Sequence, residues 1–139
     1  VCSSDLMQKL LPHYQYMVVD NEAGMEHISR GILPKVDTLI LVSDCSRRGV
    51  QAAGRIAQLA KECNLNPSTM GLIVNRAPGG KLNAGTLEEI EQEGLNLLGV
   101  VPHDDLVYEY DCDGKPTVQL PDDSAVRTAL NEIIKKISL

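Results

Sequence analysis

The feature that most constrains the fold is a fourfold alternation of a short apolar run, a polar loop and a helical pattern. The four apolar runs are "YQYMVVD", "DTLILVSD", "MGLIVNR" and "NLLGVVPHD". Runs of this length, rich in Val, Ile and Leu and separated by helices, are typical of parallel strands buried on both faces. The sequence therefore predicts an α/β fold of three layers, with a mainly parallel sheet between flanking helices.

Helices are expected where apolar residues recur at intervals of three and four. Residues 47–64 show this spacing clearly, with Val50, Ala53 and Cys63 on the apolar face, so Cys63 is predicted to fill the core. Further helices are expected over residues 3–11, 82–96 and 122–139.

The helix expected at 122–139 opens with an N-cap at residues 122–124. Its apolar stripe lies beside Lys135 and Lys136. That pattern suits a helix that closes the sheet, with two cations near its negative end, and it also suits a helix lying on a membrane surface.

Composition excludes several classes of partner. The 139 residues fit one domain, and 13 basic against 19 acidic residues give a net charge of −6, so no positive field would attract nucleic acid. No apolar run approaches the roughly 20 residues of a membrane span and no signal pattern opens the chain, so no membrane partner and a cytoplasmic location are expected. The four cysteines are far apart, which favours reduced thiols.

Polar residues at the carboxyl ends of the expected strands are the candidates for a site, because ligands of open parallel sheets bind there. Asp20 ends the first apolar run, where a carboxylate can hold Mg²⁺. Gly24 follows it, and a glycine lets a backbone N–H approach a phosphate. From spacing alone, the two residues could equally make a turn into the next helix.

Two later strand ends carry further candidates. Asn75, followed by Arg76, has a side-chain amide that both donates and accepts, so it could read the edge of a purine or simply make a turn. Pro102, His103 and Asp104 could lie against a bound base, or could only lead the chain out of the sheet.

The run "MVVDNEAGMEHISRG", with "VDTLILVSDCSRRGVQAAGRIAQLA", "GLIVNRA" and "LLGVVPHDD" after it, resembles the carbon monoxide dehydrogenase maturation ATPases of the CooC type. These are nickel-insertion relatives of MinD and the nitrogenase iron protein. The resemblance implies a P-loop NTPase fold of the SIMIBI type. It also implies that residues 1–139 are the C-terminal portion of a single such domain, without its phosphate loop and first switch.

The resemblance also implies roles for individual residues. Asp20 would be the Mg²⁺-linked aspartate of the second switch, and Gly24 the switch glycine near the γ-phosphate. Asn75 with Arg76 would be the purine-recognising pair, and residues 102–105 would border the base. Cys2 would stand where the second of two metal-binding cysteines lies between subunits, although the first has no counterpart in this sequence.

The function implied is that of an ATP-dependent metallochaperone that assists nickel insertion into carbon monoxide dehydrogenase, acting as a homodimer with ATP and Mg, and with Ni or Zn as its metal. No Gly-x-x-x-x-Gly-Lys-Ser/Thr run is present, so this chain alone should neither bind ATP tightly nor hydrolyse it. Two alternatives stay open: a MinD-like membrane-associated ATPase and a non-catalytic protein-interaction module.

Overall fold

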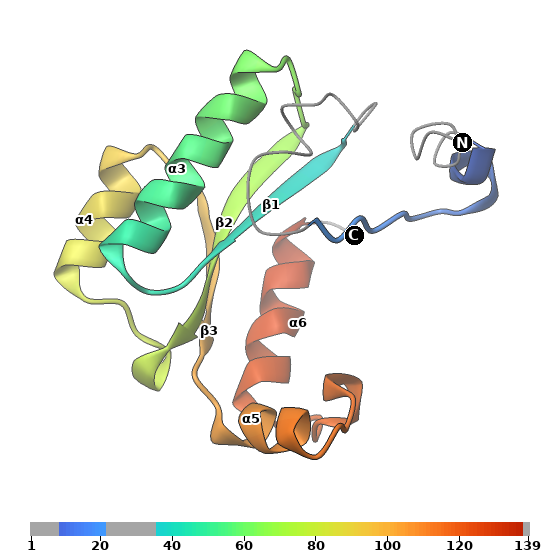
Figure 1. Cartoon of the computed structure of the whole chain (residues 1–139), viewed down its shortest axis with the longest axis vertical. Coiled ribbons are helices and arrows are strands. Elements are labelled where there is room, and N and C mark those ends of the chain that lie inside the picture. Colours follow the sequence, from blue (N-terminus) through green and yellow to red (C-terminus); the bar gives the residue numbers. More distant parts are fainter. Residues whose placement is uncertain (1–8, 22–35, 138–139) are drawn as a thin grey trace.

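The computed structural model describes residues 9–21 and 36–137, and its centre is a parallel three-stranded sheet (Figure 1). The sheet order is β1-β2-β3, with β1 at Thr38–Ser43, β2 at Thr69–Ala77 and β3 at Leu97–Pro102. Both strand pairs are parallel. In the first pair the register is continuous, from Thr38 opposite Thr69 to Ser43 opposite Val74. The predicted α/β class is confirmed.

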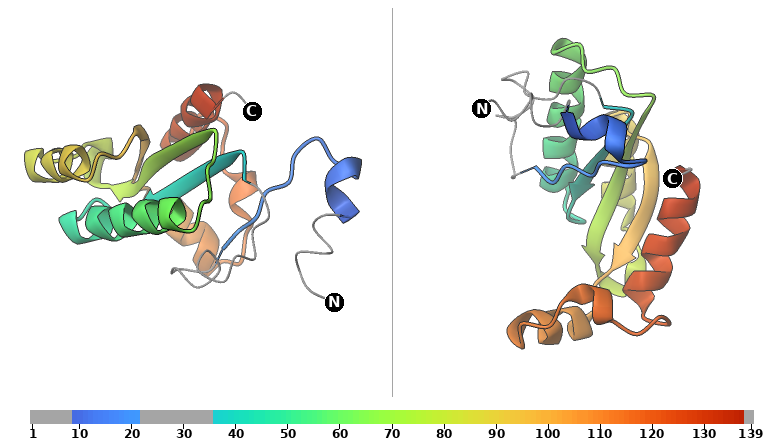
Figure 2. Two further views of the ribbon diagram at one scale, coloured as in Figure 1. Left: turned by 90° about the horizontal axis from the view of Figure 1, so that it is seen from above. Right: turned by 90° about the vertical axis from the view of Figure 1, so that its right-hand side faces the viewer.

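Helices flank both faces of this sheet. α3 and α4 lie on one face and α6 on the other, which gives three layers in Figures 1 and 2. The α-helices are α3 (Arg47–Glu62), α4 (Ala84–Gln92), α5 (Asp105–Cys112) and α6 (Ala125–Ile137), and the short 3-10 turns are η1 (Leu11–His13), η2 (Pro78–Gly80) and η3 (Thr117–Gln119). No helix within residues 9–21 and 36–137 is long and apolar enough to cross a bilayer.

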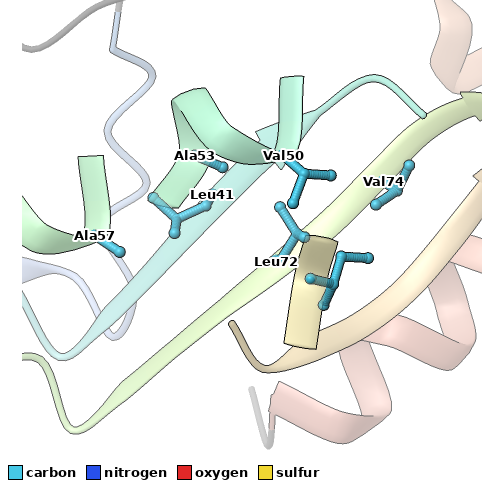
Figure 3. Close-up of a cluster of buried hydrophobic side chains, with 7 residues drawn as sticks. Leu41, Val50, Ala53, Ala57, Leu72 and Val74 are labelled. Carbon is cyan, nitrogen blue, oxygen red and sulfur yellow. The ribbon is translucent and has the colours of Figure 1, made fainter. Parts of the chain in front are cut away.

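The larger part of the core lies between the sheet and α3 (Figure 3). Leu72, in the central strand, and Val50, on α3, are completely buried. Ala53 and Ala57 face the sheet beside them, and their small side chains let the helix approach closely. The apolar stripe predicted for this helix therefore packs against the sheet, as its helical spacing indicated.

The second part of the core lies under α6. Ile133 and Ile137 pack against buried side chains of β2 and β3, and Lys136 Nζ donates to the backbone oxygen of Leu98 at 2.8 Å. Ser124 Oγ accepts from the backbone N–H of Arg127 at 3.2 Å, as expected of an N-cap. Of the two interpretations of this helix, the structure shows the one in which it closes the sheet.

The prediction that residues 14–20 form a buried strand is wrong. The structure shows no strand there, Val18 is 91% exposed, and the segment runs outward from the sheet in Figure 1. High β propensity does not suffice, because a strand needs a hydrogen-bonded neighbour and a surface to pack on. Among the described residues β1 pairs only with β2, so this segment has no such neighbour.

Two further predictions need correction or extension. Cys63 is exposed and does not fill the core, because α3 ends at Glu62 and Cys63 is its C-cap, beyond the apolar stripe. The sequence did not predict α5 at all. Most of the helix expected at 3–11 lies outside the described residues. Within the described part, residues 9 and 10 are helical and the 3-10 turn η1 begins at Leu11.

Candidate functional site

A groove of about 770 Å³ lies at the carboxyl ends of the strands, on the α6 side of the sheet. Its walls come from β1, β2, β3, α5, η3 and α6. Five residues predicted from the sequence line it: Asn75, Arg76, Pro102, His103 and Asp104. A smaller cavity of about 320 Å³ lies among residues of the opposite strand ends and contains none of them. The structure thus brings the two later strand ends into one concave surface.

An irregularity in the ladder shapes this surface. Beyond the pair of Val74 and Val100, β2 has two residues, Asn75 and Arg76, where β3 has one. Arg76 takes a left-handed backbone conformation with φ of 55°. Such bulges redirect side chains at the ends of strands and are frequent next to functional sites. Here the bulge falls on the two residues that the sequence singled out.

Asn75 is oriented by its own neighbour. Its Oδ1 accepts from the backbone N–H of Arg76 at 2.9 Å. A carbonyl oxygen has two lone pairs and the amide nitrogen has two hydrogens, so the side chain keeps capacity both to accept and to donate. That combination can bind the ring nitrogen and the exocyclic amine of an adenine edge.

The segment from Pro102 to Asp105 forms the rim beside α5. The backbone N–H of His103 donates to the oxygen of Ala77 at 2.9 Å, and His103 Nε2 lies 3.1 Å from Asp105 Oδ1. Asp104 Oδ1 accepts from the N–H of Leu106 at 3.0 Å and caps α5. Asp104 therefore has a structural role, whatever it contacts in the groove.

Arg127 fixes the opposite wall. Its Nη1 donates to the backbone oxygen of Leu120 at 2.7 Å and pairs with Asp122 Oδ1 at 2.8 Å. These contacts tie the chain after η3 to the first turn of α6. The groove thus combines arginines and a histidine with carboxylates and an apolar floor, a mixture that suits a polar ligand with a flat apolar face.

The end of β1 adds a negative charge next to this groove. Hydrogen bonds from the Ser46 hydroxyl, at 2.6 Å, and from the Ser46 backbone N–H, at 2.9 Å, hold the pKa of Asp44 below its usual value. The positive charge of Arg76 lowers this pKa further, while slight desolvation of the exposed carboxylate opposes the shift. Asp44 is consequently ionised at neutral pH.

A buried polar network, which the sequence analysis missed, fixes the turn after β1. Thr86 Oγ1 donates to the backbone oxygen of Cys45 at 2.8 Å. Glu89, only 3% exposed, accepts from Arg47 Nε and Gln51 Nε2, each at 2.8 Å. The sequence signal for a buried carboxylate was Glu89 itself, an acidic residue directly before Ile90 in the helix predicted over residues 82–96. These contacts fasten the start of α3 to α4.

This network predicts an acid dependence of stability. Hydrogen bonds from Gln51, and then from Arg47, lower the pKa of Glu89 from its ordinary 4.5. A lowered folded-state pKa means that the stabilisation is complete above the unfolded-state pKa and is lost as pH falls through the folded-state value. We expect Glu89→Gln to lower Tm by several degrees at pH 7, with the gap closing below pH 4.

Thermal unfolding followed by circular dichroism from pH 7 to pH 3 measures this gap. Glu88→Gln is the matched control, because Glu88 is the exposed neighbour on the same helix. A gap between wild type and Glu89→Gln that stays constant over the whole pH range would show that the carboxylate charge does not contribute.

The remaining site predictions are not brought together with the groove. Asp20 is exposed and is not among the groove residues. Gly24 and Cys2 lie outside the described residues. Within the part of the chain that the structure describes, no group of three His, Cys, Asp or Glu side chains could hold a metal ion. The magnesium and nickel sites therefore stay predictions.

Comparison with known proteins finds similar sequences and similar solved structures. No family model matches the chain. The chain is 33% identical over 137 residues to an uncharacterised ATP-binding protein of Methanocaldococcus jannaschii, a match that covers 95% of the chain and 52% of that protein. It is 30% identical over 111 residues to the carbon monoxide dehydrogenase accessory protein CooC of Rhodospirillum rubrum, covering 76% of the chain and 41% of CooC.

The relatives of this chain also include the septum site-determining protein MinD of Bacillus subtilis, which is 29% identical over 126 residues, covering 87% of the chain and 46% of that MinD. A solved structure of MinD from Pyrococcus horikoshii in complex with Mg-ADP superposes with a TM-score of 0.76 at 18% identity, over 96% of the chain and 54% of that MinD. This likeness shows the MinD/ParA fold. The chain spans about half the length of these proteins, or less.

Proposed function

We propose that this chain forms the base-binding portion of an ATP-binding ATPase of the MinD/ParA type. The observation that carries the proposal is that Asn75, Arg76, Pro102, His103 and Asp104, from two strand ends, line one groove of about 770 Å³. A groove of this size falls within the usual range of small-molecule sites.

The residues present fit the base end of a nucleotide. Asn75 would hold the edge of adenine, while Pro102 and the backbone next to it would lie against the ring. When bound, the triphosphate with its Mg²⁺ would supply the phosphoryl group for hydrolysis. Phosphate affinity comes mainly from a glycine-rich loop and its lysine, which this sequence lacks. We therefore expect weak binding that depends on the base.

A nuclear magnetic resonance titration with adenosine tests this proposal. Backbone amides of residues 75–77 and 103–105 should shift, with a Kd on the order of 1 mM, which corresponds to about −4 kcal/mol. Mg·ATP should bind no more than a few-fold tighter than adenosine. Asn75→Leu should abolish the shifts by removing the amide, whereas Asn66→Leu, in the smaller cavity, should leave them unchanged.

Two outcomes would contradict the proposal. Adenosine shifts that map to α3 and α4, away from the groove, would place the base elsewhere. Shifts that survive in Asn75→Leu would show that this amide does not recognise the base.

We also propose the finer role of a nickel-inserting metallochaperone for the protein that contains this chain. The CooC match supports it, and so does the sequence run that resembles the CooC type. In this role Cys2 and Asp20 would serve the carried metal and the Mg²⁺ of the nucleotide, within a homodimer. ATP would close the dimer, and hydrolysis would reopen it and release the metal.

Calorimetric titration of Ni²⁺ and Zn²⁺ into the full-length protein separates this role from that of a general ATPase. Binding at one metal per dimer, lost in Cys2→Ser, would support the metallochaperone. A protein that binds ATP but neither metal would not be a chaperone for nickel.

A further inference from the structure

The smaller cavity, of about 320 Å³, lies between α3 and α4 at the amino ends of the strands. The two helices lie side by side on one face of the sheet (Figure 1). The floor of the cavity is apolar, since Leu41 and Ala57 are buried and Met70 packs against the same cluster. Its volume lies at the lower end of the range for small-molecule sites. The cavity is separate from the groove proposed to hold the base, because no residue lines both.

The rim of this cavity is built by two helix ends of the same type. Asn64 after α3 and Gly94 after α4 both take a left-handed backbone conformation, with φ of 57° and 63°. The next residue donates its backbone N–H to a carbonyl in the last turn of the helix, at 2.9 Å for Leu65 and 3.1 Å for Leu95. This is the Schellman arrangement, which fixes the chain as it leaves a helix. The rim is therefore formed before any ligand binds.

Two opposite charges line the cavity. Lys61 lies in the last turn of α3, and Glu93 is the C-cap residue of α4. The carboxylate of Glu93 rests on the backbone of α3, because a Cβ added at Gly54 would overlap its Oε2. Neither charged side chain makes an ion pair or a hydrogen bond within residues 9–21 and 36–137. Both charges are consequently available to a ligand.

The spacing of these charges selects the shape of the ligand. Gly54, Ala57 and Lys61 lie on one face of α3, at intervals of three and four residues. The distance from Gly54 to Lys61 along the helix axis is about 10 Å, at the usual rise per residue. Helical side chains point towards the amino end of their helix, so the Lys61 side chain leads back over Ala57 towards Glu93. A ligand that meets both charges therefore carries a cation and an anion several ångströms apart.

We propose that the cavity between α3 and α4 binds an elongated zwitterion, a small molecule with an ammonium group and a carboxylate at opposite ends of an apolar chain. Glu93 and the negative end of the α4 dipole bind the ammonium group. Lys61 binds the carboxylate, and the apolar chain of the ligand covers Leu41, Ala57 and Met70. This site does not depend on nucleotide binding, because the groove lies at the opposite ends of the strands.

A nuclear magnetic resonance titration of the whole 139-residue chain with 6-aminohexanoate tests the proposal. Backbone amides of Lys61, Leu65 and Leu95 should shift, with a Kd on the order of 1 mM, while those of residues 75–77 and 103–105 should not. Hexylamine and hexanoate each lack one charge and should bind about threefold more weakly, since an exposed ion pair contributes a factor of this size. Norleucine, the isomer with both charges on one carbon, should also bind about threefold more weakly.

Charge-reversal variants test the two residues together. Lys61→Glu places two acids at the cavity, so it should bind 6-aminohexanoate more weakly and 1,6-diaminohexane more tightly than wild type does. Glu93→Lys should also weaken binding of 6-aminohexanoate. The variant with both substitutions should restore it, because a zwitterion can then bind in the reverse direction. Arg55→Glu and Glu91→Lys change exposed charges of the same helices outside the cavity and should alter Kd by less than twofold at about 0.15 M salt.

Three results would overturn the proposal. The first is that 6-aminohexanoate shifts no amide around the cavity. The second is that hexylamine, hexanoate or norleucine binds as tightly as 6-aminohexanoate, because the two separated charges would then contribute nothing. The third is that the doubly substituted variant folds, by circular dichroism, but does not recover binding, because the charges of Lys61 and Glu93 would then not be the ones that hold the ligand.

Discussion

Replacing Leu72 with alanine should remove a large share of the free energy of unfolding of this domain. Leu72 is completely buried in the central strand, between β1 and β3, and it contacts the cluster under α3 (Figure 3). Truncating a leucine at such a site costs about 2 to 5 kcal/mol, through lost transfer free energy and the cavity left behind. Domains of this size have only about 5 to 15 kcal/mol of stability in total.

The expected cost lies towards the upper end of that range. Relaxation of neighbouring groups reduces the penalty of a cavity, but Leu72 is held in a strand paired on both sides, so the backbone cannot move inward. The surrounding side chains include Ala53 and Ala57, which are too small to fill the gap. Urea unfolding followed by circular dichroism measures the loss in the free energy of unfolding.

Leu87→Ala is the matched control for Leu72→Ala. Leu87 is 44% exposed on α4, so the same chemical change there should cost less than about 1 kcal/mol. Equal losses for the two variants would mean that the cluster under α3 is not the main core. A loss at Leu72 below about 1 kcal/mol would imply that α3 moves to fill the space.

The sequence was most informative where local pattern and burial agree. Residues 47–62 carry an apolar stripe of helical period, and the resulting helix buries that stripe on the sheet. The three later apolar runs became strands because each has a parallel neighbour to complete its hydrogen bonds. Residues 14–20 have an equally strong strand pattern, but no strand among residues 9–21 and 36–137 pairs with them, so the pattern alone gave the wrong answer.

The groove shows the same limit at the level of single residues. Strand ends of a parallel sheet must meet at one edge, so the sequence could place Asn75 and His103 together. It could not show that a bulge gives Arg76 a left-handed conformation, since that depends on the register between β2 and β3. Nor could it show that Glu89 is buried, because its compensating partners Arg47 and Gln51 are about 40 positions away.

Replacing Gly99 with alanine should detach α6 from the sheet. A Cβ at Gly99 would overlap Ile133 Cγ1 and lie only 2.7 Å from Ile133 Cδ1, far inside van der Waals contact. Ile133 is 3% exposed and β-branched, so it has little freedom to turn away. Overpacking of this kind costs about 1 to 3 kcal/mol. Here it would weaken the packing of α6 against β3.

The contrast with Gly54 makes this last prediction specific. A Cβ at Gly54, in the middle of α3, would overlap the carboxylate of Glu93, the flexible end of a side chain that can move towards solvent. Alanine is also favoured over glycine in a helix by about 1 kcal/mol, so Gly54→Ala should leave stability nearly unchanged. Hydrogen exchange separates the two variants. Gly99→Ala should speed exchange in α6 selectively, whereas Gly54→Ala should not, and unchanged α6 protection in Gly99→Ala would show that the helix is held from elsewhere.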